Sequence, residues 1–410
     1  MEMVISADQV LAGLERRAIT RGAVLVRDGQ IAAVDQLEPV LAQASGNTTH
    51  LEFPEATLLP GLIDSHVHLA FDAGPDPAST VLNSTDDQLL VMMAANANRL
   101  LGTGVTTVRD LGDRGGLAMR LRDLVADGVL PGPRIVAAGT PLTVPGGHCW
   151  FLGGEAAGAD RLRAIVERNA EAGADLIKVM ATGGHLTPEG PAMGESQFTR
   201  EELRLVVAEA ARFGLPVAAH AHGTQGIADA VAAGVSTIEH CTWLGDGGFD
   251  VPGAVVDKLV AGQITVSPAI SRNWRVFPQR FGTEITEQLL SRLRWYDEHE
   301  IPVIAGTDAG VPGAAFDEFV SALEVFHHVG LSNDRVLELA TTAAAEALGL
   351  IETTGHLSAG TDADLLVVGG DPRTELDALR DVRLVAARGR FHVPADSGKT
   401  PARRRDGENN

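Results

Sequence analysis

The chain contains very little of several features that mark particular protein classes. Only Cys149 and Cys241 are cysteines, too few for a disulfide framework. No apolar stretch approaches the roughly 18 residues that a membrane-spanning helix needs. The N-terminal residues 1–6 lack a basic region followed by a long apolar core, so we expect no secretory signal and a cytoplasmic location.

Basic residues are also scarce. The sequence has 33 lysines and arginines against 54 acidic residues, a formal net charge of -21. This balance argues against nucleic acid and against anionic membrane surfaces as partners. The partners that we expect are a small-molecule substrate and further copies of the chain in a homo-oligomer. The length of 410 residues suits one large domain and one small one.

Short β-branched runs separated by turns occupy both ends of the chain. Asp28-Gly29 lies between two of these runs and is a hairpin signal. The simplest interpretation is one small β-domain assembled from the two chain ends. The runs are Met3–Ser6, Ala23–Arg27 and Gln30–Val34 near the start and Ala363–Val368 and Val382–Arg390 near the end.

Between these ends, helical patterns alternate with short apolar runs. A glycine often closes the helical pattern just before the next run, as Gly173 and Gly214 do. Eight strand-then-helix units over about 290 residues are typical of a (β/α)8 barrel. A doubly wound open sheet is the alternative. The runs are 60–68, 105–110, 134–138, 175–180, 216–220, 237–240, 264–268 and 302–308.

Residue types that bind metals lie at the ends of five of these runs. In a strand, His66 and His68 point to the same face, so their ring nitrogens can close on one metal ion. Catalytic groups of a (β/α)8 barrel lie at the C-terminal ends of its strands. An open sheet would have difficulty bringing ligands from runs one, four, five, six and eight to one point. The candidates are His66, His68, Lys178, His220, His240 and Asp308.

Together these motifs resemble the metal-dependent amidohydrolase superfamily. The segment 60–68 is similar to its first-strand signature, 306–309 to its eighth-strand signature, and 360–365 to the turn that re-enters its β-domain. The resemblance covers the chain to about residue 394. It implies an α/β fold: a TIM-type (β/α)8 barrel with a small β-sandwich built from both termini. We expect β-sandwich parts at 1–59 and 354–394, the hydrolase barrel at 60–353 and a disordered tail at 395–410.

The resemblance also implies the cofactor and the chemistry. Two Zn²⁺ ions per chain are expected, bridged by Lys178 after its carbamylation by CO2. Neutral imidazole suits such a metal. A hydroxide shared by the metals would attack an amide carbonyl. Asp308 and His240 are the expected catalytic residues, with Asp308 passing the proton to the leaving nitrogen.

Within the superfamily, the chain resembles the imidazolonepropionase-like branch and its prolidase and carboxypeptidase group. Gly146-Gly147-His148 after the third strand carries part of this likeness, and a histidine of this type faces the substrate's carboxylate in such enzymes. The expected substrate-binding residues are His148, His185, His222 and Arg272. The chain departs from the group where it has His220-Ala221-His222, because members often carry tyrosine at the third position. Its single tyrosine, Tyr296, lies in a helical stretch.

Three functions therefore stay open. The leading one is hydrolysis of a dipeptide or N-acyl amino acid. The second is hydrolysis of a lactam, imidazolone, carbamate or aryl amide, because the tyrosine is missing. The third and most remote is a non-catalytic homologue that binds a partner; the full set of six ligands argues against it. Deamination is disfavoured, but the ligands alone do not exclude it.

Overall fold

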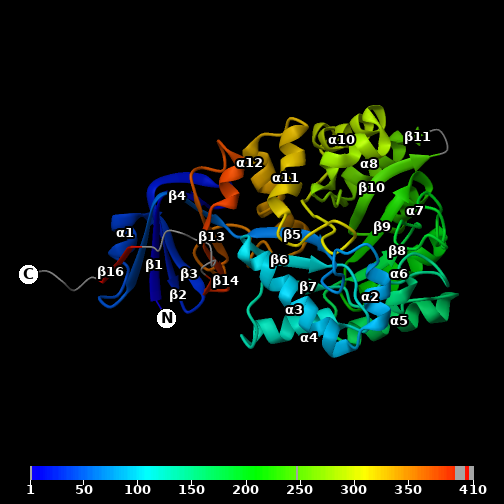
Figure 1. Cartoon of the computed structure of the whole chain (residues 1–410), viewed down its shortest axis with the longest axis horizontal. Helices are drawn as coiled ribbons and strands as arrows, with labels where there is room; N and C mark the ends of the chain where they lie inside the picture. Colours follow the sequence, from blue (N-terminus) through cyan, green and yellow to red (C-terminus); the bar gives the residue numbers. More distant parts are fainter. Residues whose placement is uncertain (1, 246–247, 393–401, 406–410) are drawn as a thin grey trace, which may run out of the picture.

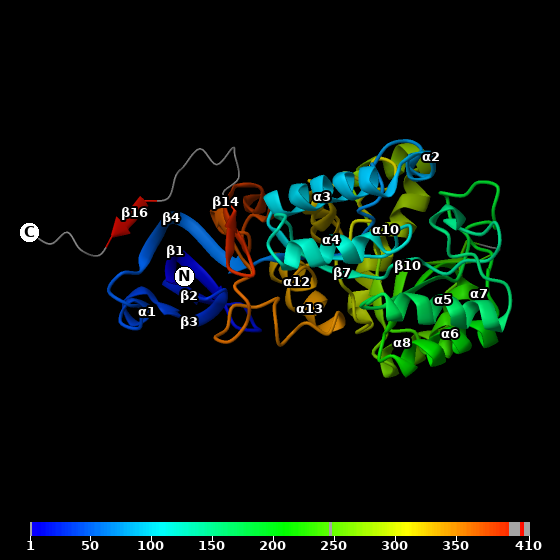
Figure 2. The ribbon, with the colours of Figure 1, turned by 90° about the horizontal axis from the view of Figure 1, so that it is seen from below.

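The computed structural model describes residues 2–245 and 248–392, and the backbone of 402–405. Two regions follow one another along the long axis of the molecule, a β-domain and a larger α/β region (Figure 1). The same division is visible from below (Figure 2). None of the helices in these described segments is long and apolar enough to cross a membrane.

The β-domain is one hydrogen-bonded sheet drawn from both ends of the chain, in the order β15-β14-β13-β4-β1-β2-β3. Its predicted hairpin is confirmed: Arg27 pairs with Gln30, and Asp28 and Gly29 have φ values of 51° and 87°. Two successive positive φ angles are what a type I′ turn requires. The strands are β1 (Glu2–Ala12), β2 (Arg17–Arg27), β3 (Gln30–Gln36), β4 (Thr49–Pro60), β13 (Leu365–Gly369), β14 (Val382–Ala387) and β15 (Arg390–His392), with α1 (Leu37–Leu41) after β3.

Four residues of the tail that we expected to be disordered form a strand. Ala402–Arg405 forms β16 and pairs antiparallel with Thr49–Glu52 of β4. On that side of β4, β13 pairs only with residues 56–60, which leaves the edge of the earlier residues for another strand. The rest of the predicted tail, residues 395–401 and 406–410, lies outside the described residues.

The α/β region alternates strands and helices as the sequence predicts. Its strands are β5 (Leu62–Val67), β6 (Val105–Asp110), β7 (Arg134–Ala137), β8 (Ile177–Met180), β9 (Val217–Gly223), β10 (Thr237–Gly245), β11 (Gly248–Phe249) and β12 (Thr265–Ser267). Its helices are α2 (Pro77–Asn83), α3 (Asp86–Gly102), α4 (Leu117–Ala126), α5 (Ala159–Glu171), α6 (Arg200–Arg212), α7 (Thr224–Ala233), α8 (Gly253–Ala261), α9 (Phe277–Phe281), α10 (Thr283–Glu298), α11 (Phe319–His328), α12 (Asn333–Leu339) and α13 (Thr342–Ala347). Short 3-10 helices span Trp150–Leu152, Arg272–Val276 and Leu376–Arg380.

The parallel strands form two sheets rather than one continuous barrel sheet. One has the order β5-β6-β7, and the other runs from β8 through β9 to β10, which also pairs with β12. The eighth predicted run is not a strand. It makes single bridges, Val266 to Val303 on one side and Val67 to Ala309 on the other. The left-handed backbone of Asp308 (φ 59°) interrupts regular pairing there.

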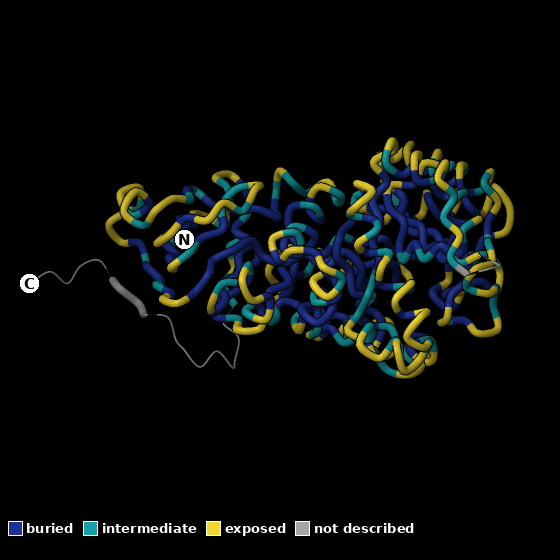
Figure 3. Tube along the Cα trace, turned by 90° about the horizontal axis from the view of Figure 1, so that it is seen from above, coloured by how far each residue is buried: buried dark blue, intermediate teal, exposed yellow. Residues whose placement is uncertain are grey.

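Apolar packing joins the two regions. Figure 3 shows the buried residues gathered in the interior and the exposed ones on the outer turns of the chain. Leu11 and Leu59 of the β-domain belong to the same apolar cluster as the strands of the α/β region. Gly104 packs so closely on Leu366 that an added Cβ would lie 2.7 Å from it. The β-domain therefore braces the end of the strands opposite to the candidate site.

Candidate metal centre

The first group of possible metal ligands joins β5 to the eighth run. His66 Nε2 lies 3.3 Å and His68 Nε2 3.5 Å from the same atom, Asp308 Oδ1. The three ligand atoms lie within 4.8 Å of one another. The predicted convergence of the two histidines therefore takes place, with a carboxylate at the same point.

The second group contains three imidazoles. His220 and His222 come from β9 and His240 from β10, and one ring nitrogen of each lies within 4.8 Å of the others. His220 Nε2 is 3.0 Å from the carbonyl oxygen of Gly183, which leaves Nδ1 as its free ligand atom. His222, which we expected to bind substrate, uses Nδ1 in a 3.0 Å hydrogen bond with Thr242 Oγ1 and keeps Nε2 free. The geometry brings it into the ligand group.

The two groups are neighbours, and Lys178 belongs to the same cavity. The ring centroids of His66 and His240 are 5.2 Å apart. Lys178 is buried in β8, and its Nζ has no hydrogen-bond partner among the described residues. Burial lowers the pKa of this amine to about 8. A buried polar atom without a hydrogen-bond partner destabilises the fold, so this position favours a ligand or a modification of the amine.

The charges fit the binding of a divalent metal. Burial lowers the pKa of His68 to about 3 and holds the pKa values of His220 and His240 well below the usual range, so their rings are neutral donors. For His66, burial lowers the pKa, but the nearby Asp308 and Glu239 carboxylates outweigh it and the net shift is upward. Burial also opposes ionisation of Asp308, yet the imidazoles of His66 and His68 lower its pKa to about 2.

The backbone is strained where two of these ligands sit. His240 and Asp308 have φ values of 65° and 59°, in the left-handed region that few residues with a side chain adopt. The pairing of β10 with β9 shifts register just after His240. Such strain is characteristic of functional sites, where it directs a side chain that a regular strand would turn away.

Both ligand groups open into a cavity of about 430 Å³. His148 and His185, two of the residues predicted to bind substrate, line it. His148 is buried with its ring centroid 4.6 Å from that of His220, and burial lowers its pKa to about 4. An added Cβ on Gly184 would lie 2.4 Å from the His148 ring, so this glycine allows the histidine to reach the centre.

Residues 57–391 match the family model described as the Amidohydrolase family. The chain belongs to this family. The family resemblance read from the sequence motifs is thereby confirmed.

Curated relatives and solved structures agree with this assignment. The chain is similar to ochratoxinase from Aspergillus niger, with 25% identity over 89% of the chain and 81% of the relative. It is 27% identical to imidazolonepropionase from Mesorhizobium japonicum, over 85% and 86% of the two chains. A solved Xaa-Pro dipeptidase with bound methionine in its active site has a TM-score of 0.84 and 27% identity, and the match covers 96% of this chain and 100% of that one.

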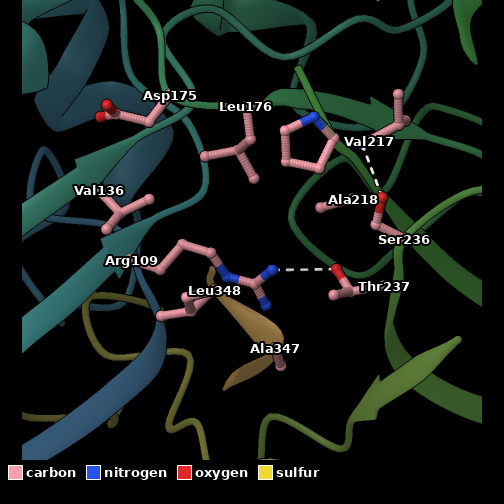
Figure 4. Close-up of a pocket in the computed structure, with 11 residues that line it drawn as sticks. Arg109, Val136, Asp175, Leu176, Val217, Ala218, Ser236, Thr237, Ala347 and Leu348 are labelled. Carbon is pink, nitrogen blue, oxygen red and sulfur yellow. Dashed lines mark hydrogen bonds between the residues drawn. The ribbon is translucent and has the colours of Figure 1, made fainter. Parts of the chain in front are cut away.

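A buried charge network supports one ligand of this amidohydrolase-family chain. Glu239 Oε2 lies 2.9 Å from His66 Nδ1 and orients its ring. Arg109 donates to Glu239 Oε1 at 2.9 Å and to Thr237 Oγ1 at 3.0 Å. Arg109 also lines a small cavity of about 30 Å³ at the beginning of β8, β9 and β10 (Figure 4). Sequence reasoning missed Glu239 and Arg109; their signal is a charged residue within a buried strand.

One predicted substrate-binding residue is misplaced. Arg272 is more than half exposed, does not line the cavity and forms an ion pair with Glu318. A loop position after a strand does not fix where a long side chain points, and a nearby carboxylate holds this one outside. The arginines that line the cavity are Arg280 and Arg292, from α9 and α10.

Proposed function

We propose that the protein is a metal-dependent hydrolase that cleaves an amide C–N bond of a small substrate, most simply a dipeptide or an N-acyl amino acid. One observation carries this proposal: two adjacent groups of ligand atoms share a cavity with the unpartnered amine of Lys178. Family membership and the dipeptidase-type structural relative support it.

We also propose that the fold is a barrel with a terminal β-sandwich. We take the two parallel sheets and the eighth run as one (β/α)8 barrel, because Leu142 bridges to Val179 between the sheets and the eighth run bridges to its two neighbours. The curved terminal sheet would be the family's β-sandwich. In this arrangement all candidate ligands stand at the C-terminal ends of the parallel segments, where barrel enzymes hold their catalytic groups.

The residues present fit two zinc ions. Neutral imidazoles and an ionised carboxylate are the donors that Zn²⁺ prefers. His66, His68 and Asp308 would hold one ion, and His220 and His240 the other, with His222 as a further imidazole of that group. Carbamylated Lys178 would contribute to both. Bound divalent metals lower the pKa of water and polarise a carbonyl group. A neutral amine is the form that reacts with CO2, and the lowered pKa of Lys178 favours that form.

The chain's own groups then divide the remaining work. Asp308 is ionised, so its carboxylate accepts a proton from the attacking water and returns it to the leaving nitrogen. Glu239 holds the His66 ring in one orientation. His148, which has no hydrogen-bond partner on Nδ1 among the described residues, is placed to donate to the substrate. The buried position of these groups excludes bulk water from them.

A second candidate function is hydrolysis of an uncharged lactam, imidazolone, carbamate or aryl amide. Histidine at position 222 favours it, because the peptidase-like group often has tyrosine there. Part of the cavity wall is apolar, formed by Leu186, Met193, Ile270, Phe277 and Leu289, and would accept an aryl or alkyl group.

Two measurements test the proposal. Metal analysis of protein grown with zinc should give about two divalent ions per chain, because both ligand groups suit a tetrahedral site. A screen of dipeptides, N-acyl amino acids, lactams and aryl amides should release free amino acid from the first two classes. Protein without metal would contradict the binuclear centre. Turnover of lactams or aryl amides alone would favour the second function.

A further inference from the structure

The cavity contains a cationic side chain whose role the metal chemistry leaves unexplained. Arg292 lies on α10 and lines the cavity together with Leu289, Leu293 and Tyr296. These residues are spaced by three, four and seven positions, so they share one face of the helix. Leu293 and Tyr296 pack into the core, and Arg292 is the charged residue within this face.

Arg292 has no acidic partner within the described residues, in contrast to most of the other arginines near it. Arg272, Arg275, Arg294 and Arg335 each form an ion pair with a carboxylate. Arg292 instead donates through Nε to the carbonyl oxygen of Leu289 at 3.2 Å and through Nη1 to that of Cys241 at 3.5 Å. A guanidinium is always protonated under physiological conditions, so a net positive charge remains in the cavity wall.

The side chain is nevertheless held in a fixed orientation. Its Cζ lies 4.9 Å from the centroid of the Phe249 ring, within cation–π distance. Arg292 is half-buried and lies one helical turn before Tyr296, whose hydroxyl donates to the carbonyl oxygen of Cys241 and accepts from Trp243 Nε1. Nη2 makes no hydrogen bond to the residues that the structure describes. Nη2 and the second proton of Nη1 therefore remain, and these two nitrogens can receive a carboxylate by two parallel hydrogen bonds.

The charge also lies near the proposed metal centre. Arg292 Nη1 is 3.5 Å from the carbonyl oxygen of Cys241, the residue after His240, and its side chain lines the same cavity as His222. The His222 ring in turn stacks on His240 at a centroid distance of 4.6 Å. Arg292 and the second ligand group thus line one cavity, and an anion held by Arg292 would leave the adjoining part of a small molecule in the cavity with the ligands.

We propose that Arg292 is the receptor for the substrate's carboxylate, so that the chain selects acylated amino acids with an apolar side chain over neutral amides. This inference rests on the proposed function for the position of the scissile amide. Arg280 is the competing cation of the cavity. It is exposed on the short helix α9, where water already solvates its charge.

Binding of an uncleavable pair of ligands tests the subsite separately from catalysis. We would titrate zinc-loaded full-length protein by calorimetry with 3-phenylpropionate and with neutral 3-phenylpropan-1-ol. The wild type should prefer the carboxylate. Arg292→Met, which keeps an apolar stem, should weaken carboxylate binding by about 30-fold or more and leave the alcohol unchanged. Arg292→Lys should restore part of the loss, since charge returns without the fork.

The matched control is Arg294→Met, on the exposed side of the same helix, where Arg294 pairs with Glu298 at 2.8 Å. It should bind both ligands as the wild type does. Undiminished carboxylate binding by Arg292→Met, or its loss in Arg280→Met instead, would overturn the inference. If Arg292→Met loses carboxylate binding while the enzyme hydrolyses only uncharged lactams, the subsite stands and the proposed peptidase-type function fails.

Discussion

The two ends of the parallel strands both contain buried charged or polar groups, but these groups are paired at one end and unpaired at the other. At the beginning of β8–β10, Arg109 is paired with Glu239, Thr237 and the carbonyl oxygen of Ser65, beside a cavity of about 30 Å³. At the other end, Lys178 Nζ and His148 Nδ1 have no partner among the described residues, and the cavity measures about 430 Å³. Paired charges indicate a structural role, whereas unpaired ones indicate a place for ligands.

The backbone differs between the ligands and the paired network. His240 and Asp308 have positive φ angles. Arg109 lies within a regularly paired strand, with Arg109 opposite Val136 of β7. Backbone strain of this kind persists only where the surrounding structure fixes it. Four substitutions test this division, from the largest expected effect to the smallest.

The largest effect is expected for Asp308→Asn. An amide cannot accept the proton from the attacking water or return it to the leaving nitrogen, so kcat should fall by about 10³-fold or more. Steady-state kinetics on a substrate found in the screen measures this, with circular dichroism to check the fold. Wild-type kcat in this variant would remove Asp308 from the role of proton carrier.

Arg109→Met should be the most destabilising of the four. It leaves Glu239 as a buried carboxylate without its main cation, which costs about 3–5 kcal/mol of unfolding free energy. Denaturant unfolding of the metal-free protein measures the loss. The control Arg122→Met removes a partly exposed pair with Asp175 and should cost less than about 1 kcal/mol. Equal losses in the two variants would contradict a structural role for the buried network.

His148→Ala should lower kcat/KM by about 10–200-fold, the range for losing one hydrogen bond to a charged or strongly polarised acceptor. The family resemblance led us to expect a contact with the substrate's carboxylate. With Arg292 assigned to the carboxylate, we now expect the same loss on an N-acyl amino acid and on its neutral amide. A loss confined to the carboxylate substrate would return that contact to His148 and weaken the case for Arg292.

Lys178→Met should have the smallest effect on stability. The amine is buried without a hydrogen bond, so replacing it with an apolar side chain should change the unfolding free energy of the metal-free protein by about 1 kcal/mol or less. Bound metal should nevertheless fall from about two ions per chain, since the bridge is lost. Full metal content in this variant, measured by elemental analysis, would rule out the bridging carbamate.

The same contrast explains what could be predicted from the amino-acid order. Ligand types at strand ends are visible because strand periodicity and the βα order place them on one face. His66, His68, His220, His240 and Asp308 could be identified in this way, and the structure brings them together. The Asp28-Gly29 hairpin followed from turn chemistry, which is equally local.

Other features needed the tertiary structure. Arg272 follows the seventh run and looked like a substrate residue, but Glu318, 46 positions later, holds it outside the cavity. Arg292 lies in a helix whose orientation toward the centre depends on how α10 packs. Neither outcome can be read from a local pattern. The direction of a long side chain depends on the opposite charges and the open space around it, and these come from other parts of the chain.

The sequence by itself thus determined the alternating strand and helix order, the hairpin and the identity of most candidate metal ligands, since each depends on periodicity and short-range backbone preference. Only the tertiary structure decided that His222 joins the ligand group, that Glu239 and Arg109 support His66, and that Arg292 rather than Arg272 faces the cavity. These depend on contacts between residues tens to more than a hundred positions apart, which packing of the whole core fixes.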